Sequence, residues 1–517
     1  MGSAGPAAVE PTPSAARDDA ESNYRDGLAL LEQGDAAGAL DYFHLALHYA
    51  PDLFPACAAR ARALAALRRP DDEAGAYREF LRANPGHPGA AYALALWHHS
   101  RGEHEPALEL LRPLADSRPP NRVACNLLGL ILGREFGRYA EAEQFLRLAL
   151  EPDPQWPVAL CNLGWILLEK GDYAQGLRLL DTVLAHHPDD QEVRLVRSYM
   201  NLKRADFAKG WRDYDARLHS RFAVQRQVCH PQWDGAPIPG KTLLIYSEQG
   251  FGDQIMFASC FGDAIALAGR CIIECDPRLV ALFRRSFPSA SIEASAPAER
   301  PAAAAAHAQA IDCEIPMGNL PGLFRNSWEE FPRHSGYLRA EPERIAYWRS
   351  RLEALGPGPK IGLSWRGGVA ATRRHLRSLA LEELLPLLRQ PAGFVSLQYG
   401  DCAGELSQLR KEHGLTLSHW QDALDDYAET AALVCALDLV VSVCTSVIHL
   451  TGALGKPVWI LVPAVAEWRY LGQGETMPWY PSARLFRQTD STAWGAVIQR
   501  VAAELKRLQG NAGTSFQ

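Results

Sequence analysis

The feature that most constrains the fold is a regular spacing of prolines across the first 220 residues. Prolines recur at positions 51, 85, 119, 154 and 188, in steps of 34, 34, 35 and 34 residues. Between them lie paired amphipathic runs such as NLGWILLEK and AQGLRLLDTVL. A second series of marks keeps the same period: Gly34-Asp35, Arg68-Arg69, Gly102-Glu103, Gly137-Arg138, Gly171-Asp172 and Ala205-Asp206. A sustained period of this length indicates a stack of similar helix pairs.

Small residues recur where paired helices must approach closely: Gly27, Ala61, Ala95, Gly129 and Gly164. This order of helix, tight turn, second helix and terminal proline resembles the tetratricopeptide repeat (TPR). We expect five units and a final helix pair that ends near Leu218. Stacked helix pairs leave a concave groove that can hold an extended or helical partner, so the sequence predicts an α-helical solenoid that binds protein.

The limits of this solenoid follow from composition. Residues 1–21 are small, Pro-rich and acidic toward their end, which predicts a disordered N-terminus. Residues 22–222 are assigned to the repeats with their capping helices, and the aromatic segment 204–218 to the cap itself. The polar, Pro-rich segment 223–240 is interpreted as a linker.

Two asparagines in the repeats, Asn126 and Asn162, resemble rungs of an asparagine ladder that would bind a peptide backbone. They lie 36 residues apart where the local period is 35. Because this offset places them in different registers, we expect no ladder.

Short apolar runs and helical runs alternate from residue 241 onward. Eight strands are expected, over 241–246, 270–275, 311–315, 360–365, 394–398, 438–443, 456–463 and 484–488. Buried strands that alternate with helices are typical of doubly wound parallel sheets. The spacing predicts two lobes, 241–340 and 341–517, with ligands at the carboxyl ends of the strands.

The sequences at these strand ends carry a resemblance. They include GFGDQIMFA, SLQYGD, SVCTSVIHLTGALGKPVWILVP, EWRYL and the Arg377-Ser378 pair. Together with the repeats they resemble bacterial TPR glycosyltransferases, among them flagellin glycosyltransferases. They are distantly similar to lipopolysaccharide heptosyltransferases and, in architecture, to O-GlcNAc transferase. The resemblance implies a GT-B fold of two Rossmann-like lobes and metal-independent, inverting transfer from a nucleotide sugar bound mainly to the second lobe.

The catalytic base that the resemblance implies is Asp253, at the end of the first strand of the first lobe. The alternative for Asp253 is a helix-capping role, which is common for aspartate. Glu248 in the same loop is the second candidate for the base. Gly252 would let the chain turn closely beneath the cleft and is assigned to the donor-binding set.

Donor-binding residues are expected mainly on the second lobe. Thr445 and Ser446 open a helix directly after a strand, where backbone N–H groups and the helix dipole favour a phosphate. An ordinary Ser/Thr cap is the alternative. His449 follows on the first turn of that helix, and the alternative for it is a buried core histidine.

Further donor contacts are expected from loops that follow other strands. Arg366 and Arg377 could give charge-assisted hydrogen bonds to a diphosphate or to a donor carboxylate. Gln398 and Tyr399 are placed beside the nucleotide base by the resemblance alone.

Cys444 departs from the family pattern, which has aspartate before Thr445-Ser446. A neutral thiol cannot hold a sugar hydroxyl or pair with a cation as a carboxylate does. The change favours either a donor with its own carboxylate, such as a CMP-nonulosonic acid, or an impaired active site. A UDP- or GDP-sugar remains open as the donor.

Net charge and hydropathy limit the classes of partner and the location that we expect. The formal net charge of -7 argues against nucleic acid as the main partner. No apolar run reaches the roughly 18–20 residues of a spanning helix, and the N-terminus lacks a signal-peptide core. We therefore expect a cytoplasmic location. No cofactor is expected, and no metal site, since no Asp-x-Asp follows a strand.

The sequence thus predicts a bacterial enzyme for protein O-glycosylation, in which the repeats recruit flagellin or another surface protein and a sugar is moved to Ser or Thr. Two alternatives stay open. One is a non-catalytic TPR adaptor with a degenerate transferase domain, and the other is a glycosyltransferase that acts on a glycan or lipid.

Overall fold

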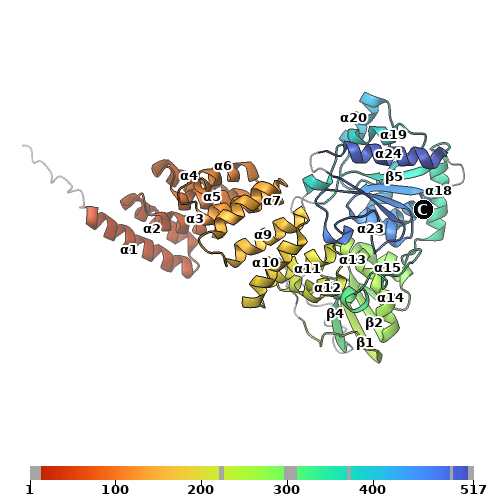
Figure 1. The fold of residues 1–517 in the computed structure, drawn as a ribbon, viewed down its shortest axis with the longest axis horizontal. Helices are drawn as coiled ribbons and strands as arrows, with labels where there is room; N and C mark the ends of the chain where they lie inside the picture. Colours follow the sequence, from red (N-terminus) through yellow and green to blue (C-terminus); the bar gives the residue numbers. More distant parts are fainter. Residues whose placement is uncertain are drawn as a thin grey trace, which may run out of the picture. The chain divides into compact units, whose positions relative to one another are not determined.

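The structure is a computed structural model that describes residues 13–220, 226, 228–295, 311–368, 374–489 and 493–510. The chain divides into two compact units, Met1–Lys170 (unit 1) and Gly171–Gln517 (unit 2) (Figure 1).

Unit 1 consists of helices in which each packs on the next along the chain (Figure 1). They are α1 (Pro13–Glu32), α2 (Ala36–Tyr49), α3 (Phe54–Ala66), α4 (Pro70–Ala83), α5 (Pro88–Ser100), α6 (His104–Ala115), α7 (Arg122–Arg134), α8 (Tyr139–Leu150) and α9 (Pro157–Lys170). The sequence prediction of a helical repeat solenoid is confirmed.

The turns inside the helix pairs share one backbone conformation. Positive φ angles occur at Gly34, Arg68, Gly102, Gly137, Gly171 and Ala205. These positions repeat the spacing of the sequence marks, including the single 35-residue step. A left-handed residue ends the first helix of each pair, which explains the glycines. Arg68 and Ala205 hold the same conformation, with φ of 57° and 62°, although side chains disfavour it.

Close approach explains a second set of small residues. A Cβ atom on Gly129 would lie 2.7 Å from Leu146 Cγ and 2.9 Å from the Ala142 carbonyl oxygen. Helices α7 and α8 can therefore pack this closely only with glycine at position 129.

One expectation for unit 1 is corrected. Helix α1 begins at Pro13, so residues 13–21 are helical rather than disordered. A proline suits the first turn of a helix, and α1 is held by its packing on α2. Residues 1–12 lie outside the described residues.

The two asparagines of the repeats meet in the structure. Asn162 Nδ2 donates a hydrogen bond to Asn126 Oδ1 at 2.9 Å. The two helices α7 and α9 also contact each other directly. The one-residue offset therefore does not keep these side chains apart, and the absence of a peptide-binding ladder stays a prediction.

Unit 2 begins with helices that continue the repeat pattern. These are α10 (Tyr173–His186), α11 (Gln191–Lys203), α12 (Phe207–Tyr214) and the 3-10 helix η1 (Asp215–Leu218). Phe207, Trp211 and Tyr214 are buried in the same hydrophobic cluster as the sheets that follow. Trp211 Nε1 donates to the Arg325 carbonyl oxygen at 2.7 Å, and its ring meets the Trp468 ring edge-on. The capping helices are thus part of the α/β unit.

The first sheet is parallel, with strand order β3-β2-β1-β4. Its strands are β1 (Ile238–Tyr246), β2 (Ala268–Cys275), β3 (Ser291–Ala294) and β4 (Cys313–Pro316). The helices beside it are α13 (Phe251–Phe257), η2 (Ala258–Cys260), α14 (Phe261–Leu267), η3 (Pro277–Leu279), α15 (Val280–Ser286), η4 (Met317–Asn319) and α17 (Leu320–Phe324). The 3-10 helix η2 separates α13 from α14, and Arg325 Nη2 donates a hydrogen bond to the Ser259 carbonyl oxygen there.

The segment expected as a linker partly joins this sheet. Gln232 pairs with Glu314 beside β4, and the Trp233 ring is buried in the core. Strand β1 also starts at Ile238, before the predicted boundary at 240. Residues 221–225 and 227 are outside the described part of the chain.

The second sheet is also parallel, with order β10-β9-β8-β5-β6-β7. Its strands are β5 (Lys360–Ser364), β6 (Gly393–Ser396), β7 (Ser418–His419), β8 (Leu439–Val443), β9 (Val458–Val462) and β10 (Ala483–Arg487). Counted from β5 as the first strand, this is the 3-2-1-4-5-6 order of doubly wound nucleotide-binding sheets. The chain adds strands outward on one side from β5 to β7 and then on the other side from β8 to β10, so the strand order reverses between β5 and β8. All eight predicted strands are present. Strands β3 and β7 were missed because four and two residues are too short to show a period.

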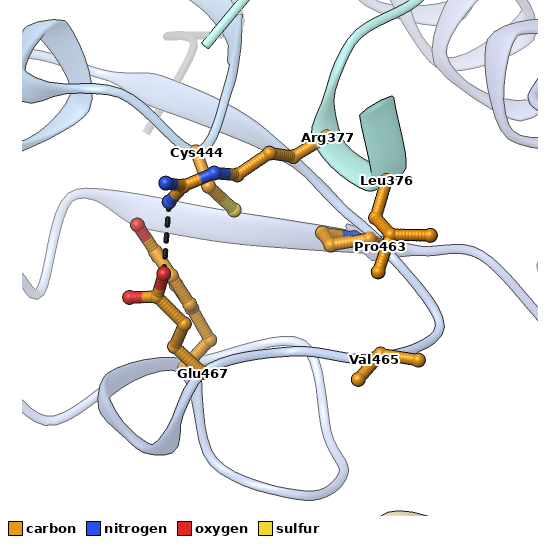
Figure 2. A pocket seen from close by; sticks show the side chains of 7 residues that line it. Leu376, Arg377, Cys444, Pro463, Val465 and Glu467 are labelled. Carbon is orange, nitrogen blue, oxygen red and sulfur yellow. Dashed lines mark hydrogen bonds and ion pairs between the residues drawn. The ribbon is translucent and has the colours of Figure 1, made fainter. Parts of the chain in front are cut away.

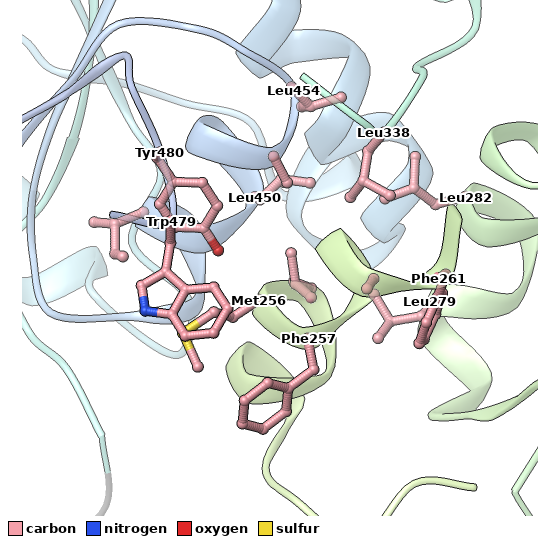
Figure 3. Close-up of a cluster of buried hydrophobic side chains, with 14 of the residues drawn as sticks. Met256, Phe257, Phe261, Leu279, Leu282, Leu338, Leu450, Leu454, Trp479 and Tyr480 are labelled. Atoms are coloured by element: carbon pink, nitrogen blue, oxygen red, sulfur yellow. The ribbon is translucent and has the colours of Figure 1, made fainter. Parts of the chain in front are cut away.

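Helices around the second sheet are α18 (Pro342–Glu353), η6 (Arg374–Arg377), η7 (Leu381–Leu384), α19 (Leu385–Leu388), α20 (Ala403–His413), α21 (Gln421–Asp425), α22 (Tyr427–Ala436), α23 (Ser446–Ala453), η8 (Trp468–Tyr470) and α24 (Gly495–Gly510). One buried cluster joins the two sheets through α13 and α23. Figure 3 shows its centre, with Met256, Phe257, Leu450, Trp479 and Tyr480 among the residues drawn.

Candidate functional site

A cleft of about 570 Å³ lies at the carboxyl ends of strands from both sheets. The segments after β1, β5, β6, β8 and β9 all contribute to it. Its lining residues are Phe251, Gly252, Asp253, Arg278, Gly368, Arg377, Leu397, Tyr399, Leu424, Asp425, Tyr427, Thr430, Cys444, Thr445, Ser446, Val447, His449, Glu467, Arg469 and Tyr470. Ligands of open α/β sheets bind at this edge of the sheet, so the cleft is the candidate site.

Asp253 lies in the cleft on the first turn of α13. Its Oδ1 atom accepts a hydrogen bond from Arg469 Nη2 at 2.6 Å. The N-cap of α13 is Gly250, and no side chain caps this helix. Asp253 therefore does not serve as the helix cap that the alternative interpretation required.

Arg469 and Glu467 are site residues that the sequence analysis did not assign. Arg469 forms ion pairs with Asp253 and with Glu467. Glu467 Oε1 in turn lies 2.8 Å from Arg377 Nη1, and Figure 2 shows this contact beside Cys444. The EWRYL sequence, which follows β9, could have indicated both residues, because the segments that follow the strands meet at the cleft.

The start of α23 faces the same cleft. Thr445 is its N-cap, and the Thr445 Oγ1 atom accepts from the Val447 amide at 3.3 Å. The ordinary capping role is thus present, while Thr445 and Ser446 also line the cleft. Gly252 lies against this helix, and a Cβ atom there would come within 3.1 Å of the His449 ring. Glycine at 252 thus lets α13 approach α23.

His449 is a buried residue beneath the cleft. Its Nδ1 atom lies 3.0 Å from the Tyr480 hydroxyl. Burial, and then the charges of Arg469 and Arg377, lower the pKa of His449 well below its usual range. The imidazole is therefore neutral near pH 7 and suits hydrogen bonding rather than charge neutralisation.

Cys444 lies near Arg377 and Arg469 and beside Tyr470. Burial raises the pKa of its thiol to about 11, even though nearby arginines lower it. Its Sγ atom is directed toward the Leu461 carbonyl oxygen at 3.7 Å. Cys444 therefore brings no charge to the site and is a poor nucleophile.

Gln398 and Tyr399, the two residues expected beside the nucleotide base, have different surroundings in the structure. Tyr399 lines the cleft, is 46% exposed and accepts a hydrogen bond from the Gly368 amide at 2.9 Å. Gln398 is buried, and its amide group binds the backbone of residues 365, 366 and 399. Gln398 thus orders the loop after β5, because its hydrogen-bonding groups are used internally.

Arg366 is also turned away from the cleft. Its Nη2 atom lies 2.7 Å from the Asp401 carbonyl oxygen and 2.9 Å from Glu405 Oε2. Of the two arginines expected at the site, only Arg377 lies in the lining.

Glu248, the second candidate for the base, has a structural role. Its Oε1 atom accepts from Arg217 Nη2 at 2.6 Å and from the Gly318 amide at 3.2 Å. The Glu248 and Arg217 side chains are only 7% and 5% exposed. This buried pair connects η1 to the first sheet, which leaves Asp253 as the carboxylate at the end of β1 that faces the cleft.

In the described ranges, no three His, Cys, Asp or Glu side chains are grouped so that they could hold a metal ion. Within the same ranges, no helix has both the length and the apolar character to cross a membrane.

The helical repeats match a known protein family. Residues 58–122 and 134–205 each match the tetratricopeptide repeat family. Among solved structures, pilF of Pseudomonas aeruginosa matches with a TM-score of 0.34 and 15% identity, over 40% of this chain and 91% of its own. MamA of Desulfovibrio magneticus matches with a TM-score of 0.29 and 20% identity, over 34% and 97%.

One relative is similar to this chain over most of the length of both proteins. Protein FlbA of Caulobacter vibrioides is 30% identical over 501 residues, which cover 93% of this chain and 83% of FlbA. This coverage includes the repeats and both sheets. The chain therefore belongs to the FlbA family of TPR-containing proteins.

Proposed function

We propose that this protein is an inverting, metal-independent GT-B glycosyltransferase. It moves a sugar from a nucleotide donor to Ser or Thr of a protein that its repeats recruit in the cytoplasm. Asp253 removes the proton from the acceptor hydroxyl, and the oxygen then attacks the anomeric carbon as the nucleotide leaves. The observation that carries the proposal is the meeting of Asp253 from one sheet with Arg377 and the start of α23 from the other.

The chemistry of the cleft supports these roles. Glycosyl transfer needs a carboxylate on one side of the sugar and stabilisation of a leaving phosphate on the other. Arg377 and the N-terminus of α23 supply positive charge for the phosphate. Neutral His449 can donate or accept a hydrogen bond there, and exposed Tyr399 offers an aromatic face for the base.

The repeats support a protein acceptor. TPR stacks bind protein partners along their helices. Flagellin or a similar surface protein is the acceptor that the resemblance implies, and the donor is a CMP-nonulosonic acid or a UDP- or GDP-sugar.

Transfer is tested by intact-protein mass spectrometry. The full-length protein is incubated with flagellin from the source cell and each class of nucleotide sugar. The expected result is a mass increase of one or more sugar residues with one donor. No mass change with any donor, together with no nucleotide binding by calorimetry, contradicts the proposal.

The chain offers a matched control for the base. Asp263 lies in a second Phe-Gly-Asp triplet ten residues after Asp253, and it too is paired with an arginine, Arg325, at 2.6 Å. Asp263 does not line the cleft. Asp253→Asn should lower the transfer rate at least about a hundredfold, the order expected for a lost general base. Asp263→Asn should leave the rate within about threefold once both variants are shown to be folded.

One observation favours the adaptor as a second candidate. The carboxylate of Asp253 is paired with Arg469, and Cys444 supplies no charge. An adaptor would bind the protein partner through its repeats but bind no nucleotide sugar. Calorimetry with the same donors separates the two candidates.

A further inference from the structure

Two arginines of the cleft share a single carboxylate. Arg377 Nη1 lies 2.8 Å from Glu467 Oε1, and Arg469 forms an ion pair with Glu467 Oε2. Both guanidinium groups keep their charge at any physiological pH. Glu467 therefore occupies the place of an anion between two fixed cations.

Both arginines have capacity for a further acceptor. The Nε atoms of Arg377 and Arg469 are buried and have no hydrogen-bond partner within the described residues. The two side chains are only 14% and 13% exposed. Because a buried donor without an acceptor costs free energy, this pair favours a ligand with several oxygen atoms.

Two carboxylates lie at this pair, Glu467 between the arginines and Asp253 on Arg469 alone. Cys444 and His449 are neutral, and the N-terminus of α23 adds a partial positive charge. The formal charges of Arg377, Arg469, Glu467 and Asp253 sum to zero. A phosphate group that enters this site meets the Glu467 carboxylate directly, so Glu467 has to leave first.

Glu467 is the charged residue of this set that can move most easily. Its side chain is 31% exposed, compared with 18% for Asp253 and less for both arginines. It precedes η8 in the segment after β9 and belongs to no strand or helix. Rotation of this one side chain toward solvent would release both guanidinium groups from Glu467, while Arg469 keeps its pairing with Asp253.

We propose that Arg377 and Arg469 form the binding site for the phosphate groups of an anionic ligand, and that Glu467 is an internal competitor displaced when the ligand binds. The identity of the ligand as a nucleotide sugar rests on the proposed function. The competition itself does not, since any compact polyphosphate can engage the two arginines.

The same exchange acts on the proposed base. Arg469 is the counter-ion of Asp253. When phosphate oxygens engage Arg469, Asp253 loses part of this pairing and becomes available to an acceptor hydroxyl. The base is thereby held inactive until an anionic donor is in place.

Isothermal titration calorimetry with inorganic pyrophosphate tests the proposal on the full-length protein. Glu467→Gln keeps the shape of the side chain and removes its charge. If Glu467 occupies the site in at least about nine of ten molecules, its removal tightens the apparent Kd about tenfold or more. Adding Arg469→Gln to Glu467→Gln should weaken binding again by at least about tenfold, and Glu467→Ser serves as a second variant if Glu467→Gln unfolds.

Glu475 provides the matched control. It also bridges two arginines, Arg484 at 3.0 Å and Arg500 at 3.1 Å, but lies outside the cleft lining. Glu475→Gln should leave pyrophosphate affinity unchanged within about twofold.

The outcomes separate this proposal from the proposed function. Equal or weaker binding by Glu467→Gln, or no detectable binding by either protein, overturns the competition even if sugar transfer is observed. Tighter binding by Glu467→Gln supports it, and it stands even when no nucleotide sugar is bound or transferred by either protein.

Discussion

The two units of this chain are packed in different ways. Alanine is the most frequent buried residue of unit 1, and the buried Phe, Trp and Tyr side chains among its described residues are Phe43, Phe80 and Trp165. The main core of unit 2 is rich in tryptophan, tyrosine and phenylalanine, and it continues from α11 and α12 through both sheets. Helix pairs that pack on neighbours form small clusters, whereas the two sheets form two large ones, of which one is shared by both sheets.

This difference shows why the end of a repeat pattern need not be the end of a structural unit. Helices α10 to α12 keep the 34-residue period, yet they belong to unit 2. Their large buried side chains decide this, because Trp211 and Tyr214 pack on Trp468 next to the site. A solenoid is stabilised by nearest-neighbour contacts, so its last helices can be recruited by another core.

The largest expected effect comes from truncation on either side of this boundary. Deletion of residues 1–170 should leave a folded unit 2 with a cooperative thermal transition. Deletion of residues 1–222 should give no cooperative transition, because it removes Trp211, Tyr214 and the Arg217 partner of buried Glu248. Circular dichroism and calorimetry on both proteins measure this. Two equally stable truncations would mean that the capping helices are not part of the core.

Single side chains should reveal the same difference on a smaller scale. Trp211→Ala should lower the free energy of unfolding of unit 2 by about 3–5 kcal/mol. Phe43→Ala should cost a similar amount, but its effect should remain in the first repeats. Hydrogen exchange resolves the two, with faster exchange across both sheets for Trp211→Ala and only near α1 to α3 for Phe43→Ala. Trp211→Phe serves as the control that keeps an aromatic ring.

The pH dependence of unit 2 should carry a contribution from His449. The pKa of His449 is lowered in the folded protein, so the unfolded state binds more protons below its pKa of about 6.5. Stability therefore falls as the pH falls through this range. The loss between pH 7.5 and pH 5.5 should be about 1.4 kcal/mol greater in the wild type than in His449→Gln. Urea unfolding at both pH values measures it, and exposed His44→Gln in unit 1 should not change the difference.

The smallest predicted effect concerns the turns that both units share. Arg68 in unit 1 and Ala205 in unit 2 adopt positive φ angles where the other repeats have glycine. Arg68→Gly and Ala205→Gly should each stabilise their unit by about 0.5–1 kcal/mol, because relief of the backbone strain exceeds the added entropy of the unfolded chain. Gly102→Ala should destabilise unit 1 by a similar amount. Thermal unfolding of the three variants tests the assignment, and a destabilising Arg68→Gly would contradict it.

Much of the local structure could be predicted from the sequence. The period, the turn positions and eight strands each depend on neighbouring residues, whose spacing is visible along the chain. The sequence also placed Asp253, Arg377, Tyr399 and the start of α23 at strand ends, and the structure brings these residues into one cleft.

At several positions the direction of the side chain could not be predicted from the sequence. Gln398 and Arg366 stand at the expected strand ends but turn inward to order a loop. Glu248 and Asp253 are five residues apart in one segment, and only the neighbours Arg217 and Arg469 distinguish them. No spacing rule predicts which arginine a carboxylate will meet from another part of the chain.

The sequence by itself determined the repeat solenoid, the two parallel sheets and the edge at which a site could form, because periodicity and burial patterns are local properties. The tertiary structure alone decided that the capping helices belong to the α/β unit, that Asn126 meets Asn162, and that Asp253, Arg469, Glu467 and Arg377 form one series of ion pairs. These depend on contacts between residues far apart in the chain, whose distances and directions are set only when the elements pack.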